Sequence, residues 1–289
     1  MVENLLNLGV SSLRHPQHIL LERVDHGQIS RGATVPEELI FEYLKKFENS
    51  LVLGAGCGIG DKEHSFWSLG EGKIRVVGVD INQRAVGQAI VSYGKETGLD
   101  YLGDDVTDLE FDSGVFQAVV GNGLLCNLVF NQETGKDDLE TTLGEFSRIL
   151  QPGGYLFLAD CLRTDDPQAK ELISLDSQVE KLPPGWDFYY WKNSWDYRYS
   201  QNEELGLKNG TFWVMSLGEG KELEFGDTNQ LVNLISEDRV ERLARHYDEK
   251  VLQDLITNSG FSQCHWEKVV WRSRTNEPLI GVVAVFKKE

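Results

Sequence analysis

The sequence predicts an α/β fold in which a doubly wound, mostly parallel sheet of seven strands ends in an antiparallel hairpin. Between residues 50 and 160, short continuous apolar runs alternate with segments of helical spacing, which is typical of a parallel sheet covered by helices on both faces. A glycine-rich turn follows the first apolar run. The last two apolar runs are joined by a turn so short that only an antiparallel pair is possible.

The first regular element is expected to be a helix near residues 36–48. Pro36 suits the first helical position, and Glu37 and Glu38 suit the positive end of the helix dipole. Two further helices are expected over 81–98 and near 139–150. The continuous apolar runs predict five buried strands at 51–56, 74–80, 101–105, 115–123 and 155–160.

The alternation is interrupted by an inserted segment over residues 166–244, for which we expect an aromatic-rich α+β cap. Eight of the fourteen residues 186–199 are aromatic. Helical spacing near 237–247 and 248–258 predicts two helices that lead back to the sheet, with Gly260 as the stop signal. The hairpin strands complete the sheet within residues 263–288.

The composition excludes several classes of function. The chain has 28 Lys and Arg against 46 Asp and Glu, so its net charge is −18 and its pI is about 4.8. Nucleic acids and anionic membrane surfaces require basic surface, and we expect neither as a partner. No apolar run reaches the roughly 18 residues of a membrane span, and the N-terminus lacks the order of a secretory signal. Four widely spaced cysteines indicate reduced thiols, no metal site and a cytoplasmic protein.

The strongest local motif is the segment LGAGCGIG at residues 53–60, directly after the first strand. Its four alternating glycines allow a sharp bend and a close approach to a ligand. The spacing matches neither the dinucleotide fingerprint nor the phosphate loop, and a tight turn without a ligand is the alternative. Asp80 ends the second strand, where an acid can accept hydrogen bonds from a ribose diol. The alternative role for Asp80 is to cap the helix that begins near Asn82.

Five segments together carry a family resemblance. In their order and gaps, VLGAGCGIG, VVGVD, GDDVTDLEF, FQAVVGNGLL and RILQPGGYLFLAD resemble class I S-adenosylmethionine-dependent methyltransferases, which have a Rossmann-like fold. The resemblance covers residues 50–160 and extends to the closing hairpin with its preceding helix. It implies that S-adenosyl-L-methionine is the cofactor and S-adenosyl-L-homocysteine the product.

The resemblance also implies which residues contact the cofactor. Gly54, Ala55, Gly56 and Gly58 would face its methionine end, and Asp80 would hold the ribose hydroxyls. Ile81 would pack on the adenine. Asp105, or the adjacent Asp104, would accept from the adenine amino group, with Val106 beside it. Asn122 and Gly123 would lie next to the sulfonium.

One position departs from the family pattern. The first strand usually ends in an acid that helps to hold the amino group of the cofactor, and this chain has Gly54 there. Either the affinity for the cofactor is lower, or Asp61 substitutes for the missing acid.

The acceptor side is predicted with alternatives. The Rossmann-like domain would comprise residues 36–165 and 245–289, with residues 1–35 as a lid. Aromatic side chains of the cap can line an acceptor pocket for a flat ring or a cation, or form the small core of the cap. His246 is the candidate general base, or else a structural residue at a helix junction. The candidate acceptor residues are Trp191, Trp195, Tyr197, Trp213 and Tyr247.

The function expected from these features is methyl transfer to a small-molecule acceptor, directed to oxygen or nitrogen, by in-line attack on the sulfonium methyl. The acceptor would be aromatic or an amine. Two alternatives differ in class from this one. The chain can use a sulfonium cofactor without methylation, or it can be a non-catalytic module that binds the cofactor and regulates a partner.

Overall fold

The computed structural model of this chain describes residues 34–45, 49–128, 130–131, 136–163, 211–215, 240–272 and 278–289. Residues 1–33 of the expected lid (1–35) and most of the expected cap over 166–244 lie outside these ranges.

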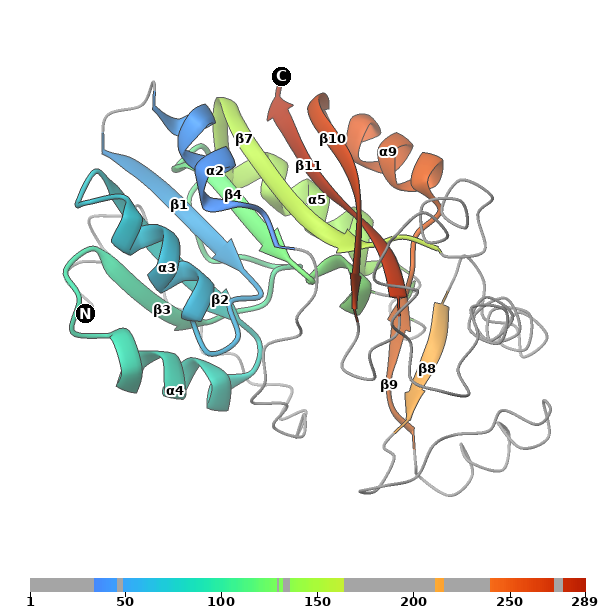
Figure 1. The fold of residues 1–289 in the computed structure, drawn as a ribbon, viewed down its shortest axis with the longest axis horizontal. Helices are drawn as coiled ribbons and strands as arrows, with labels where there is room; N and C mark the ends of the chain where they lie inside the picture. The colour runs from blue at the N-terminus through green and yellow to red at the C-terminus, as the bar shows by residue number, and fades with distance from the viewer. Residues whose placement is uncertain are drawn as a thin grey trace.

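A seven-stranded mixed sheet forms the centre of the structure (Figure 1). Its strand order is β10-β11-β7-β4-β1-β2-β3. The five strands β7, β4, β1, β2 and β3 run parallel to one another. β11 is antiparallel to both of its neighbours, so the predicted fold class is confirmed. The strands are β1 (Ser50–Ala55), β2 (Ile74–Asp80), β3 (Leu99–Gly103), β4 (Phe116–Asn122), β7 (Leu150–Cys161), β10 (Phe261–Arg272) and β11 (Pro278–Lys288).

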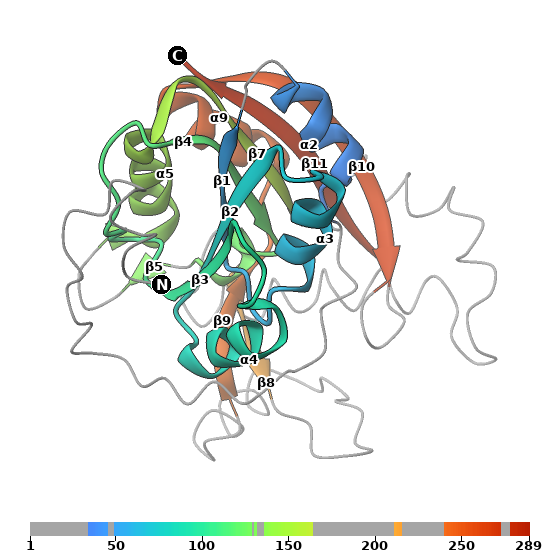
Figure 2. The same cartoon turned by 90° about the vertical axis from the view of Figure 1, so that its left-hand side faces the viewer.

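Helices cover both faces of this sheet (Figure 2). On one face lie α2 (Glu37–Leu44), α3 (Asp61–Leu69) and α4 (Gln83–Tyr93). On the other lie α5 (Asp138–Ile149) and α9 (Glu249–Asn258). No described helix is long and apolar enough to cross a bilayer.

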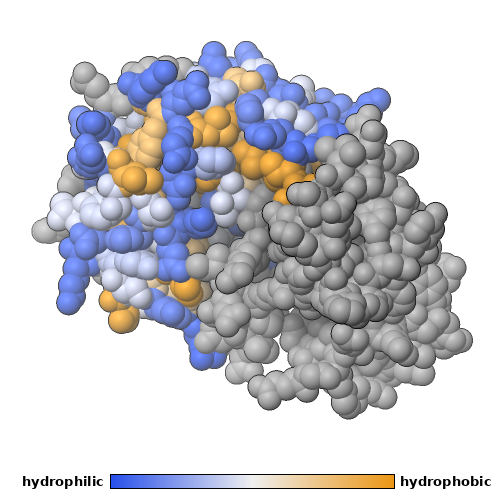
Figure 3. All heavy atoms as spheres, in the orientation of Figure 1, coloured by the Kyte–Doolittle hydropathy of each residue, from blue (hydrophilic) through white to orange (hydrophobic). Residues whose placement is uncertain are grey.

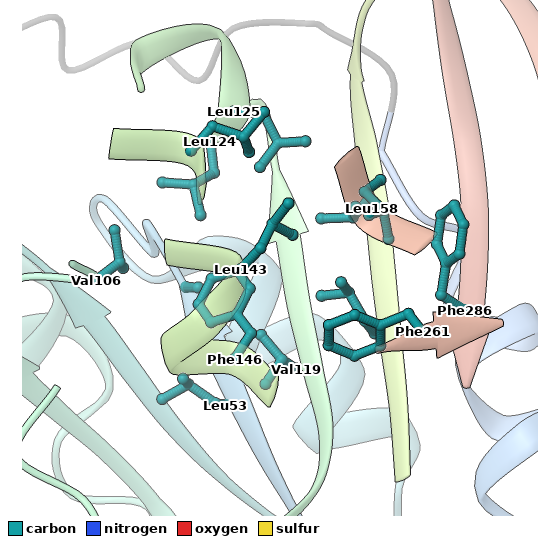
Figure 4. Packing of buried hydrophobic residues seen from close by; sticks show 14 of the residues in the cluster. Leu53, Val106, Val119, Leu124, Leu125, Leu143, Phe146, Leu158, Phe261 and Phe286 are labelled. Atoms are coloured by element: carbon teal, nitrogen blue, oxygen red, sulfur yellow. The ribbon is translucent and has the colours of Figure 1, made fainter. Parts of the chain in front are cut away.

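Two hydrophobic clusters, one on each face, hold these helices on the sheet. Figure 4 shows Leu143 and Phe146 of α5 close to Leu53 of β1 and Val119 of β4. All four side chains are fully buried, and burying a side chain of this size contributes about 1.5–3 kcal/mol. The second cluster includes these buried residues of α2, α3 and α4: Ile40, Leu44, Phe66, Val86 and Ala89.

The second cluster reaches the surface at α2. Figure 3 shows hydrophilic residues over most of the described part of this face, with a hydrophobic band across the region of α2 and the neighbouring strands. Tyr43 of α2 packs edge to face on two rings of β7, with centroids 5.0 Å from Tyr155 and 5.9 Å from Phe157. These contacts hold α2, and with it the residues from Thr34 that precede it, against the middle of the sheet.

Two short antiparallel pairs lie outside the main sheet. β5 (Phe130–Asn131) pairs with β6 (Lys136–Asp137), and β8 (Thr211–Met215) pairs with β9 (Val240–Arg245). The helix expected near 237–247 is therefore wrong, because residues 240–245 form β9. Backbone pairing with β8 overrides the helical spacing of this segment.

Candidate cofactor and acceptor site

The glycine loop bends sharply between β1 and α3. Gly56, Gly58 and Gly60 have φ angles of 71°, 55° and 83°, which favour glycine at each position. The Cys57 N–H donates to the Val79 carbonyl at 2.9 Å and so ties the loop to the end of β2. A side chain added at Gly58 would have no neighbour within 4 Å, so the loop has an open side there.

Asp80 lies at the end of β2 and joins this loop to the next helix. Its Oδ2 accepts from the Gly58 N–H at 2.8 Å, and its Oδ1 accepts from the Asn82 N–H at 2.8 Å. The capping alternative for Asp80 is wrong, because Asn82 itself caps α4 by accepting from Arg84 and Ala85. A carboxylate oxygen has two lone pairs, so each oxygen of Asp80 retains an acceptor position.

Asp104 and Asp105, the two acids after β3, differ in their hydrogen-bond partners. Asp104 accepts from the backbone N–H groups of Asp105 at 2.9 Å and Glu110 at 3.2 Å, so both of its oxygens organise the loop. Burial raises the pKa of Asp104 to about 6. Asp105 uses Oδ1 for the backbone and hydroxyl of Thr107, and its Oδ2 has no partner among the described residues. The geometry therefore favours Asp105 over Asp104 as a group that can accept from a ligand.

The remaining predicted cofactor residues lie at the carboxyl edge of the same strands. Ile81 is half-buried directly after β2, and Val106 is 8% exposed at the edge of the core. Ala55 is buried within that core, so only the backbone of Gly54–Ala55 can face a ligand. The edge thus brings together the predicted residues that follow β1, β2 and β3.

The end of β4 is connected to the N-terminal part of the chain. The Oδ1 of Asn122 accepts from the Val35 N–H at 2.8 Å. Gly123, with φ of 61°, donates to the Ala159 carbonyl at 2.7 Å, and its own carbonyl accepts from the Asn127 amide at 2.9 Å. These bonds place Val35 beside the expected sulfonium position, and the side-chain oxygen of Asn122 holds Val35.

A second polar cluster surrounds the end of β7. Asp160 is 1% exposed and accepts three backbone N–H bonds, from Leu125 at 2.5 Å, Cys126 at 3.1 Å and Cys161 at 2.8 Å. Burial raises the pKa of Asp160 to about 8, although the three donors favour its charged form. The carboxyl therefore anchors the 3₁₀ segment η1 (Leu125–Asn127) to β7.

Cys161, next in the chain, contacts the candidate base. Its thiol hydrogen-bonds with Cys126 and with His246, and these interactions lower its pKa. His246 is 4% exposed and follows β9 directly. The structure thus brings Cys126, Cys161 and His246 together from three separate segments at the carboxyl edge of the sheet.

The expectation for Tyr247 as an acceptor residue requires correction. Tyr247 is fully buried, and its hydroxyl donates to the Leu125 and Leu128 carbonyls, each at 2.9 Å. It therefore supports η1 from the core side. Trp213 lies in β8, while the predictions for Trp191, Trp195 and Tyr197 fall outside the described residues.

Asp61, the acid expected to substitute for the missing one at position 54, already has a partner. It accepts from the Tyr93 hydroxyl at 2.5 Å and so connects α3 to α4. Glu63, two residues further along α3, is the acid that packs against Gly54. It is 3% exposed, and burial raises its pKa to about 8. The combination of a glycine at the family's acidic position and an acid early in the next helix was the available sequence signal.

Comparisons with known proteins show similarity to methyltransferases. Residues 53–158 match the methyltransferase domain family. The chain is 30% identical to an eEF1A lysine and N-terminal methyltransferase of Mus musculus over 125 residues, 42% of this chain and 17% of that protein. It is 26% identical to 24-methylenesterol C-methyltransferase 3 of Arabidopsis thaliana over 168 residues, 54% of this chain and 44% of that protein. The chain thus spans less than half the length of each of these two relatives.

The fold is also similar to that of methyltransferases of known structure. A SAM-dependent methyltransferase of Methanosarcina mazei superposes with a TM-score of 0.61 at 21% identity, over 86% of this chain and 96% of that one. The seven-stranded sheet of this chain and the domain match over residues 53–158 agree with this similarity. Residues 53–158 therefore match a methyltransferase domain, and the fold is that of S-adenosylmethionine-dependent methyltransferases, whose cofactor is S-adenosyl-L-methionine.

Proposed function

We propose that this chain transfers the methyl group of S-adenosyl-L-methionine to a small-molecule acceptor, at an oxygen or nitrogen atom. The observation that carries the proposal is the position of Asp80. Its carboxylate is fixed by the Gly58 N–H at the open side of the glycine loop, at the carboxyl edge of β2. An acid in this position of a doubly wound sheet suits the two hydroxyls of a ribose.

The residues present fit this cofactor. The loop leaves open space at Gly58, Asp80 and Asp105 keep acceptor positions, and Glu63 has a buried carboxyl oxygen without a partner among the described residues. When bound, the cofactor supplies a methyl group that is already electrophilic, because it is attached to a sulfonium. The protein has to hold both reactants in line and exclude water.

Each residue has a proposed part in that arrangement. Asp80 would orient the ribose, Asp105 would accept from the adenine amino group, and Ile81 would pack on the ring. The backbone of Gly54–Gly58 would approach the methionine end, and Asn122 with Gly123 would border the sulfonium. The bonds from Val35 to Asn122 and from Gly123 to Ala159 keep that border rigid before any ligand binds.

His246 is the proposed general base for the acceptor. It follows β9 at the carboxyl edge of the sheet, in contact with Cys161 of β7. An imidazole can accept a proton near neutral pH, which is the role that this position requires. Replacing His246 with Asn is expected to lower turnover and to leave the affinity for the cofactor unchanged. The calorimetric titration described below measures that affinity.

The small-molecule acceptor is supported by two observations. One similar protein is named for a sterol substrate, and the net charge of −18 disfavours nucleic acid. The other relative is named for a protein substrate, so a protein acceptor is the outcome that would change the proposal. The division into a lid over 1–35, a domain over 36–165 and 245–289, and a cap over 166–244 is part of this proposal, as is the cytoplasmic location.

The test is calorimetric titration with S-adenosylmethionine and S-adenosylhomocysteine. Asp80→Ala should weaken both by about 1–3 kcal/mol, the cost of unpairing groups hydrogen-bonded to a charge. Asp108→Ala is the matched control, because Asp108 is an exposed acid in the neighbouring loop. Wild-type binding should be followed by a screen of aromatic and amine acceptors for methylated product.

The outcomes separate the alternatives. Equal affinity of wild type and Asp80→Ala would refute the ribose assignment. Cofactor binding with a co-purified carboxylated sulfonium would favour non-methylating chemistry. No binding of either compound would refute the proposed activity and favour a regulatory module.

A further inference from the structure

Glu63 is buried directly behind the glycine loop. It lies in the first turn of α3 and is 3% exposed. Its Oε2 has no hydrogen-bond partner among the described residues, although the atom is fully buried. A buried carboxyl with an unpaired oxygen costs free energy, and the described residues supply no partner for this one.

The side chain of Glu63 occupies the space that a side chain at position 54 would take. A Cβ at Gly54 would lie 2.5 Å from Glu63 Cγ and 2.8 Å from Cδ, closer than atoms can approach. Gly54 does not have a positive φ angle, so its backbone would accept any residue. Gly54 therefore leaves open the space beside the strand, and the carboxyl that fills that space comes from α3.

Among the described residues, most of the charges that act on Glu63 are negative. Its pKa is raised to about 8 by burial first, and then by the negative charges of Asp80 and Asp61. Lys62 on its own helix opposes this only weakly, as the smallest of the effects. The other titratable groups that face it are Cys57 of the loop and Tyr101 of β3, and burial raises the pKa of both, which keeps them neutral. The surroundings would therefore favour the entry of a positive charge.

We propose that the carboxylate of Glu63 pairs with the α-ammonium group of the methionine end of the cofactor, from the space that a side chain at position 54 would occupy. The inference rests on the proposed function, because the glycine loop has to face that end of the ligand. The geometry behind it is the unpaired buried oxygen, the glycine that makes room for it, and the open side of the loop at Gly58.

This pairing links binding to a proton. In the free protein near neutral pH the carboxyl carries a proton, because its pKa lies near 8. An ammonium group beside it favours the charged form, so the O–H bond breaks and the proton passes to the buffer. The ammonium group keeps its own protons, and no other bond changes.

The experiment compares two ligands that differ at this end. S-adenosylhomocysteine carries the amino acid, and 5′-methylthioadenosine has the same nucleoside without it. Glu63→Gln keeps the shape of the side chain and removes its charge. It should weaken S-adenosylhomocysteine roughly tenfold to hundredfold and leave methylthioadenosine unchanged. Glu71→Gln is the matched control, because it is the same substitution at an exposed acid shortly after α3, and it should change neither affinity.

Proton release gives a readout that does not depend on activity. Titrations at pH 7 in two buffers of different ionisation enthalpy should show about one proton released when S-adenosylhomocysteine binds to the wild type. Glu63→Gln should release none, and methylthioadenosine should release none from either protein.

A double variant that moves the carboxylate to the strand tests the proposal even if Glu63→Gln folds poorly. Gly54→Asp combined with Glu63→Ala returns a carboxylate to the same space from the strand side. This double variant should recover the preference for S-adenosylhomocysteine over methylthioadenosine that Glu63→Ala alone loses.

The proposal and the function on which it rests fail in different ways. If Glu63→Gln binds S-adenosylhomocysteine as tightly as the wild type while Asp80→Ala loses both ligands, the role of Glu63 is wrong and the cofactor site stands. If the wild type binds neither ligand, both are wrong.

Discussion

At the scale of single residues, the acids of the site divide by how their oxygens are partnered. Asp80 accepts from the Gly58 N–H of the glycine loop, Asp105 accepts from the Thr107 N–H of its own loop, and Asp160 accepts three backbone N–H bonds. Glu63 alone among these four leaves a fully buried oxygen without a partner in the described structure. The burial of this acid is therefore not compensated by the described residues.

This predicts a pH-dependent stability difference in the unliganded protein. The pKa of Glu63 is about 8 when folded and about 4.5 when unfolded, so the folded state holds the proton more tightly. The free energy of unfolding then falls by roughly 1.4 kcal/mol for each pH unit between these values, and the cost is complete above pH 8. Glu63→Gln removes this loss. Its advantage in melting temperature over the wild type should grow from pH 5 to pH 8.

The other carboxyls with a raised pKa, among them Asp100, do not affect this measurement. The pKa values of Asp104 and Asp160 are raised to about 6 and about 8, and both acids are present in either protein. They contribute to both curves and cancel in the difference. Parallel melting curves across this range would show that Glu63 is ionised in the free protein, contrary to the prediction.

At the scale of elements, η1 is held between the two polar clusters and the core. The hydroxyl of Tyr247 bonds the carbonyl of Leu125 within η1 and that of Leu128 directly after it, while Asp160 bonds two N–H groups of η1. The segment follows Gly123, so its position also fixes the border of the expected sulfonium site.

We therefore expect Tyr247→Phe to act on both stability and function. The change leaves the Leu125 and Leu128 carbonyls without their buried donor and should cost about 1–3 kcal/mol of unfolding free energy. Chemical denaturation measures that loss, and hydrogen exchange should rise at η1 more than in β1 or β2. Tyr43→Phe is the matched control on the opposite face of the sheet. Unaltered exchange at η1 would mean that Asp160 alone holds the segment.

The elements also show where sequence reasoning succeeds and fails. The continuous apolar run of β2 predicts 74–80, and the strand spans Ile74–Asp80, because a buried parallel strand has to be apolar on both faces. α3 leaves no such pattern, since it buries one apolar side chain, Phe66, beside Glu63. The segment of β9 has helical spacing, yet its partner β8 determines its conformation.

The same limits apply to the candidate site. Asp80 and the glycine loop follow from motif order, because the carboxyl ends of parallel strands meet at one edge. Glu63 escaped prediction because its contact with Gly54 depends on how α3 turns back against β1. The pairing of Cys161 with His246 joins residues far apart in sequence, and only the assembled sheet brings them together.

At the scale of the whole molecule, one sheet divides two cores, and the site lies along the edge that both share. Phe146 is fully buried in the cluster under α5, and its replacement by Ala should cost about 3–5 kcal/mol. Val91→Ala is the control, because Val91 is 82% exposed, and it should change stability by less than about 0.5 kcal/mol. Urea denaturation measures both values. A small loss for Phe146→Ala would mean that the core under α5 collapses into the space that the ring leaves.

The order of the strands has a consequence for the synthesis of the protein. β11 lies between β7 and β10, although it is the last strand of the sheet along the chain. While the ribosome is still making residues 278–288, β10 has no neighbour in the sheet and β7 has an open edge. At roughly 5–20 residues per second, most of the domain is exposed to solvent and to chaperones before the strand that closes it emerges. Completion of the sheet, and with it of the edge that carries Cys161, therefore waits until residues 278–288 have left the ribosome.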